Sequence, residues 1–108
     1  MPPNPNEDKE RARVRLAGRL GTDPRFRETR TGVLVGSFPI AVPQDDGSTR
    51  WETVVAFKER AAKLRGDGGP KKGRHVEVIG SRRCREQPTR DGKVRVVEEV
   101  YAVVVKPR

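Results

Sequence analysis

The feature that most constrains the fold is a strict alternation of residue types that begins at Arg13. The segment RVRLAGRL, residues 13–20, has aliphatic residues or glycine at every second position and arginine or alanine between them. Successive side chains of a strand point to opposite sides, so this period of two predicts a half-buried β-strand. The chain is therefore expected to consist of strands that each turn one face to a core.

Further strand-like segments follow, each bounded by turn residues. They are residues 32–42, 50–57, 74–85 and 94–105, with turns at Thr22-Asp23-Pro24, PQDDGST, GDGGPKKG and Asp91-Gly92. Only KERAAKLR, residues 58–65, has helical character, with Ala61, Ala62 and Leu64 available to pack on the sheet. This element order is that of the OB-fold, so we predict an all-β, five-stranded Greek-key barrel with one short helix between its third and fourth strands.

Length and charge limit the domain organisation and the partner. A chain of 108 residues has room for one domain, placed at 12–106, and the polar segment 1–11 is predicted to be a disordered arm. The formal net charge of +9 favours a polyanionic partner, nucleic acid above all, although a basic surface can also serve solubility alone. No segment has the ~20 apolar residues of a membrane helix or the pattern of a secretory signal, so we expect no membrane partner and a cytoplasmic location.

The sequence has no recognisable catalytic constellation. His75 and Cys84 are the only residues of their types, so one chain cannot form a Cys/His zinc site or a disulfide framework. GDGGPKKG looks like a phosphate cradle, but a P-loop needs Gly-Lys and then Ser or Thr opening a helix, whereas Gly73 leads into a strand. We therefore expect no enzyme, no metal and no cofactor.

The segment RWETVVAF carries the candidate binding residues. If Val54 and Ala56 face the barrel interior, Trp51 and Phe57 lie on its outer surface. Exposed rings beside cations suit single-stranded nucleic acid, because bases stack on the rings while the cations follow the phosphates. The opposite phase, with both rings in the core, fits the pattern equally well because neither phase is cleanly polar. The residues alone leave both orientations open.

Several motifs carry a family resemblance. LAGRLGTDPRFR, residues 16–27, resembles the start of bacterial-type single-stranded DNA-binding proteins, in which the first strand runs into a Gly-x-Leu-x-x-Asp-Pro-x-x-Arg turn. GVLVGSFPIAV, TRWETVVAF and KKGRHVEVIGSRRCR are similar to the next three strands of that family, so the resemblance spans about residues 13–105. It implies a non-enzymatic protein that coats single-stranded DNA. The alternatives are a primosome-type or RNA-binding OB module and a structural protein-interaction barrel.

The resemblance also implies a site. Trp51 and Phe57 are expected to point outward as stacking platforms. Basic residues along the DNA path are expected at Arg13, Arg27, Lys58, Arg83 and Arg85, and Arg15, Arg19, Arg50 and Arg95 complete the candidate set. In the hairpin of residues 81–95, Arg83 and Arg85 should share a face as a cationic ridge, unless the hairpin is only a solvated arm.

Two departures from the family pattern affect function. Pro43 or Gln44, and Gln87, stand where the family commonly has two more stacking rings, so weaker stacking is expected unless the arginines offset it. The chain ends in VVVKPR instead of the acidic tail that recruits repair enzymes. We expect an accessory or specialised paralogue in replication, recombination, repair or DNA uptake, or a chain whose tail was removed. The resemblance further implies a homodimer or tetramer, associated with the nucleoid.

Overall fold

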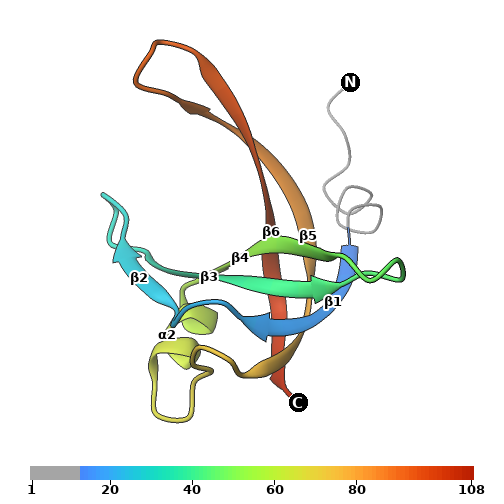
Figure 1. The fold of residues 1–108 in the computed structure, drawn as a ribbon. Coiled ribbons are helices and arrows are strands. Elements are labelled where there is room, and N and C mark those ends of the chain that lie inside the picture. Colours follow the sequence, from blue (N-terminus) through green and yellow to red (C-terminus); the bar gives the residue numbers. More distant parts are fainter. Residues whose placement is uncertain (1–12) are drawn as a thin grey trace.

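The computed structural model describes residues 13–108, and the predicted disordered arm lies outside them. These residues form β1 (Arg13–Leu20), β2 (Arg25–Glu28), β3 (Leu34–Pro43), β4 (Thr49–Phe57), α2 (Glu59–Arg65), β5 (His75–Pro88) and β6 (Val94–Pro107) (Figure 1). The helix follows the third of the long strands, as predicted. The short strand β2 is an addition to the predicted order.

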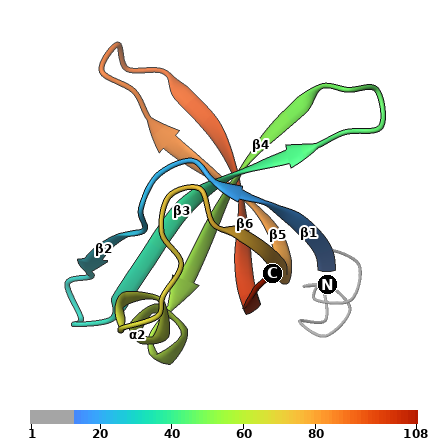
Figure 2. The same cartoon turned by 60° about the horizontal axis from the view of Figure 1, so that its bottom comes forward.

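The strands form one sheet that closes on itself. Its order is β1-β5-β6-β4-β3-β2, and β1 also pairs with β3 through Arg19 opposite Ala41 and Leu20 opposite Ile40. Gly18 permits this closure, because a Cβ at residue 18 would lie 2.2 Å from the carbonyl oxygen of Ala41. The pairing of β4 with β6 is parallel, and the steep crossing of the strands is visible in Figure 2.

The inward faces of the strands and one side of α2 form the core. Its buried members are Leu20, Phe38, Ile40, Val54, Ala56, Leu64, Val76, Val78, Val100 and Ala102. Val14 and Leu16 pack against this cluster from β1, which confirms the alternation predicted for residues 13–20. The polar residues between them face outward, so the sequence period determines which side chains are available to a ligand.

Helix α2 covers one end of the barrel. It runs from Glu59 to Arg65 and is followed by Gly66, with Ala61 and Leu64 buried. Ala62 is exposed, so the expectation that it packs is wrong. Residues three apart share one side of a helix, whereas the residue next to Ala61 is turned away. No helix between residues 13 and 108 has the length and apolarity to cross a bilayer.

Strand β2 falls in a segment that the sequence indicated as turn. It pairs with β3, with Arg25 opposite Ser37 and Phe26 opposite Gly36. Phe26 packs against the core, whereas Arg25 and Arg27 are exposed. Four residues are too few for an alternation to be recognised. Phe26 is the single apolar residue among charged neighbours, so it does not indicate a strand by itself.

The distal parts of β5 and β6 leave the barrel as a two-stranded arm, residues 83–99 (Figure 1). At its tip Gly92 has a φ of 82°, and the Thr89 amide donates to the Lys93 carbonyl oxygen over 2.9 Å. The predicted hairpin at Asp91-Gly92 is therefore confirmed. Alternate residues share a face, so Arg83 and Arg85 lie on one side of this ribbon and Val96 on the other.

Candidate nucleic-acid interface

Strand β4 carries both of its aromatic residues on the outer surface of the barrel. Val54 and Ala56 are fully buried, whereas Trp51 is 61% exposed. Phe57 shares the outward face and is half-buried. The orientation implied by the family resemblance is the one observed, and the alternative with both rings in the core is wrong.

The Trp51 ring lies over the turn that follows β1. A Cβ on Gly21 would lie 2.6 Å from Cζ3 of Trp51, so a side chain at this position would force the ring to shift. The turn is held by the Gly21 amide, which donates to Pro39 O over 2.9 Å, and by Asp23 Oδ1, which accepts from the Lys72 amide over 2.7 Å. The Gly-x-Asp-Pro motif thus forms the floor beneath Trp51 and leaves the rest of the ring open to solvent.

The Phe57 ring is supported from β6. Its centroid lies 5.1 Å from that of Tyr101, with an interplanar angle of 71°. This edge-to-face contact fixes Phe57. Tyr101 is half-buried on the same face and was missed by sequence reasoning, because the valines around it leave the phase of β6 undefined. Phe57 and Tyr101 thus form a second cluster of aromatic rings, beside Val55.

Residues that lie opposite one another on neighbouring strands form a row across this outer face, and an arginine stands at each end of the row. From β1 to β2 its members are Arg13, Ser81, Tyr101, Val55, Ser37 and Arg25. Arginines at both ends are exposed, and the centre is apolar or hydroxylic. Arg25 was not among the predicted site residues, since it lies on the unpredicted strand β2. The predicted residue Arg27 lies beside it, exposed, on the same strand.

The adjacent row contains Arg83, Glu99, Thr53 and Pro39. Arg83 and Arg85 share the outer side of the arm, as predicted, but they differ in their partners. Arg85 Nε donates to Glu99 Oε1 over 2.7 Å, and this bond raises the pKa of Arg85 above its ordinary value. Arg83 is exposed and has no ion-pair partner among residues 13–108. The ridge therefore has one free cation and one neutralised cation.

Arg50 does not lie beside Trp51 on this face. It belongs with Glu52 to the opposite side of β4, where its Nη2 is 3.5 Å from Glu98 Oε1. There Arg82 donates to both Glu52 oxygens, over 2.9 and 2.7 Å, and also to Glu98. The bond to Glu52 raises the pKa of Arg82 above its ordinary value. This ion network lies next to the core at the base of the arm. Arg50 belongs to the network and not to the aromatic face.

The remaining predicted cations are dispersed. Arg15 and Arg19 are opposite Ile79 and His75, in rows away from Trp51, and Arg19 donates to the Gly73 carbonyl oxygen over 3.0 Å. Arg95 is exposed on the arm. Lys58 follows Phe57 with a φ of 57°, an uncommon conformation for a residue with a side chain. The structure thus gathers only part of the candidate set around the rings.

Comparison with known proteins gives a consistent result. A model of the Single-strand binding protein family matches residues 12–107. The chain belongs to this family. It is 37% identical over 102 residues to the single-stranded DNA-binding protein of Thermotoga maritima, with 87% of this chain and 71% of that protein covered. It is 34% identical over 96 residues to single-stranded DNA-binding protein 2 of Staphylococcus aureus strain Mu50, covering 83% and 67%.

Membership confirms the resemblance on which the sequence interpretation depends. With it the OB-fold barrel and the general function, binding of single-stranded DNA, are confirmed for this chain. The family match does not assign roles to single residues.

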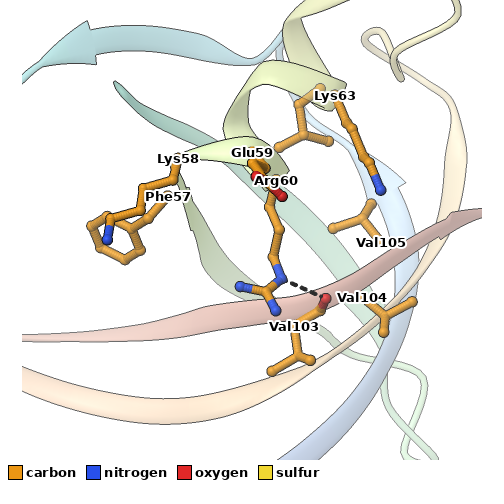
Figure 3. Close-up of a pocket in the computed structure, with 9 residues that line it drawn as sticks. Phe57, Lys58, Glu59, Arg60, Lys63, Val103, Val104 and Val105 are labelled. Atoms are coloured by element: carbon orange, nitrogen blue, oxygen red, sulfur yellow. Dashed lines mark hydrogen bonds between the residues drawn. The ribbon is translucent and has the colours of Figure 1, made fainter. Parts of the chain in front are cut away.

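Phe57 also lines a groove between α2 and the end of β6 (Figure 3). The groove has a volume of about 790 Å3, with Val103 to Val105 on one wall and Lys58, Arg60 and Lys63 on the other. Arg60 Nε donates to Val103 O over 2.8 Å. The groove therefore continues the surface around Phe57 and adds an apolar wall and a basic rim to it.

The two positions that lack the family's extra rings offer no stacking surface. Gln44 Nε2 donates to Val42 O over 3.0 Å beside the end of β3, and Gln87 is exposed on the arm. Within residues 13–108 no group of three His, Cys, Asp or Glu side chains could hold a metal ion. On this outer face the described rings are those of Trp51, Phe57 and Tyr101.

Proposed function

We propose that the chain is a non-enzymatic protein that coats single-stranded DNA, with bases over Trp51 and the Phe57–Tyr101 pair and phosphates at the basic margins. The observation that carries this proposal is the exposed indole of Trp51 on a face bounded by Arg13 and Arg25. An exposed ring on a surface with cations is the combination that single-strand binding uses, with bases on the ring and phosphates at the cations. Base stacking covers it without sequence preference, because every base has a π-face.

The experiment is a titration of the intrinsic Trp51 fluorescence, the only tryptophan signal of the chain, with oligo(dT), oligo(rU) and a duplex. Strong quenching by oligo(dT) and little by duplex is expected, because paired bases cannot reach the ring. Equal or tighter binding of oligo(rU) would favour the alternative of an RNA-binding module. No quenching by any nucleic acid would favour the protein-interaction barrel.

We further propose that two chains associate through β1. This strand pairs with β5 along residues 13–19 and meets β3 only at Arg19 and Leu20, so within residues 13–108 its other edge is unpaired up to Gly18. Exposed edges invite pairing with a second copy. Light scattering is expected to give at least twice the chain mass of 12.1 kDa. A monomer at micromolar concentration would contradict the proposal, and a tetramer would extend it.

Salt dependence distinguishes the two arginines of the arm. Each neutralised phosphate contributes about −0.7 to the slope of log K against log salt on a single strand. Arg83→Gln is expected to flatten the slope by about 0.7. Arg85→Gln should change it little, because Glu99 already neutralises this guanidinium. Equal flattening by both changes would show that DNA displaces Glu99 from Arg85, and no change by either would remove the arm from the DNA path.

The cellular role is proposed from the names of the proteins to which the chain is similar. One relative is named single-stranded DNA-binding protein 2, which supports an accessory paralogue in replication, recombination, repair or DNA uptake. A cytoplasmic, nucleoid-associated location follows from a DNA ligand. Deletion of the gene is expected to impair one of these processes selectively, and loss of viability would instead indicate the main replication protein.

A further inference from the structure

The sheet has an open edge where β4 ends beside β6. β4 pairs with β6 only as far as Tyr101, and the chain then leaves the sheet to form α2. β6 continues to Pro107 with β5 along one edge, so within residues 13–108 its other edge has no strand partner beyond Tyr101. The groove of about 790 Å3 between α2 and β6 lies along this edge, with Val103 to Val105 as its wall (Figure 3). One wall of the groove is therefore an unpaired strand edge.

An unpaired edge can bind a further strand, because its N–H and C=O groups lack partners. Val103 is the extra residue of a bulge in β6, opposite the step between Ile79 and Gly80. Its carbonyl oxygen accepts from Arg60 Nε over 2.8 Å and so points to α2. Bulges and charged side chains are common devices that limit pairing at an edge. The edge is thus guarded at Val103 and open beyond it.

The rim of the groove is cationic. Lys58, Arg60 and Lys63 are exposed along it, against one acidic residue, Glu59. None of these three cations forms an ion pair within residues 13–108. The bond to Val103 holds Arg60 by its Nε, and its two Nη groups have no hydrogen-bond partner in the described part of the chain. A guanidinium that is held in place with free N–H groups suits a carboxylate.

We propose that this groove binds an extended, acidic peptide segment of another protein, which adds to the open edge of β6 as a further strand. The peptide backbone pairs with β6, its apolar side chains contact the valine wall, and its carboxylates meet Arg60 and Lys63. A nucleic acid fits this wall less well, because it has no alternating N–H and C=O groups to offer a strand edge. A second copy of the chain is disfavoured by its own net charge of +9.

The first test measures the fluorescence anisotropy of a labelled hexapeptide of alternating aspartate and valine, without nucleic acid, against the unaltered chain, Arg60→Gln and Lys93→Gln. Lys93 is exposed at the tip of the arm, so its change removes an equal charge away from the groove. Arg60→Gln is expected to weaken peptide binding about tenfold, and Lys93→Gln should leave it unchanged. Equal weakening by both changes would overturn the proposal, because net charge alone would then attract the peptide. Absence of binding to the unaltered chain would overturn it as well.

Two comparisons identify the occupant. A peptide with lysine in place of aspartate should bind at least about tenfold more weakly, because the rim is cationic. Equal binding of the two peptides would overturn the role of the rim. Arg60→Gln should change the affinity for oligo(dT) no more than Lys93→Gln does. A loss of affinity confined to oligo(dT) would assign the rim to DNA and overturn the proposal.

The second test alters the peptide, which keeps the proposal testable if Arg60→Gln does not fold. In an extended chain alternate amides point to the same edge, so N-methylation of the aspartates blocks one edge and N-methylation of the valines blocks the other. Only one edge can face β6, so one isomer is expected to bind at least about tenfold more weakly than the other. Equal affinity of the two isomers would overturn strand addition. No DNA is present, so this failure is distinct from a failure of the proposed single-strand binding.

Discussion

Arg82→Ala is expected to lower the free energy of unfolding by about 3 kcal/mol, the low end of the cost of breaking a buried ion pair. Glu52 is only 5% exposed and receives two hydrogen bonds from Arg82. Without Arg82 its carboxylate stays buried, and the remaining cation, Arg50, is 3.7 Å away. Denaturant unfolding monitored by Trp51 fluorescence measures the change.

Two variants control this prediction. Arg90→Ala removes an exposed arginine at the tip of the arm and should change the free energy of unfolding by less than about 0.5 kcal/mol. Replacing both Glu52 and Arg82 with leucine removes the buried charge together with its partner, and should recover most of the loss. If Arg82→Ala unfolds like the unaltered chain, water satisfies the Glu52 carboxylate without Arg82 and the network does not stabilise the fold.

The barrel could be predicted from the sequence because the alternation of residue types along a strand indicates which face of the strand is buried. The alternation Val14, Leu16, Gly18, Leu20 defines both a strand and its buried side, and Asp91-Gly92 defines a hairpin. The phase of β4 could not be obtained this way, since valines occupy both sides of the strand. It is determined by tertiary packing against β3 and β6, or by the resemblance to a known family.

One physical cause explains why several of the predicted cations lie away from the rings or are already paired. Arg50 belongs to the predicted set and is adjacent to Trp51 in the sequence, yet adjacent residues of a strand point to opposite sides. Arg82 pairs with Glu52, 30 residues away, and Arg85 pairs with Glu99, 14 residues away. No local sequence pattern indicates that these cations are already paired. A count of arginines thus overestimates the charge that is free to meet DNA.

Trp51→Ala is expected to weaken single-strand binding by about 1–3 kcal/mol, the contribution of one stacked base. The slope of log K against log salt should hardly change, because the ring neutralises no phosphate. Stability should change little, since the ring is 61% exposed and lies over the turn at Gly21. The variant has no tryptophan, so the anisotropy of a labelled oligonucleotide replaces fluorescence quenching.

Two further variants separate stacking from loss of apolar surface. Val96→Ala reduces a side chain that is 66% exposed on the other side of the arm, and it should leave affinity unchanged. Trp51→Phe retains a π-face and should recover part of the affinity. A Trp51→Ala chain that binds as tightly as the unaltered protein would move the site to Phe57 and Tyr101. A loss of affinity with a flatter salt slope would mean that the indole orders the basic margins instead of stacking on a base.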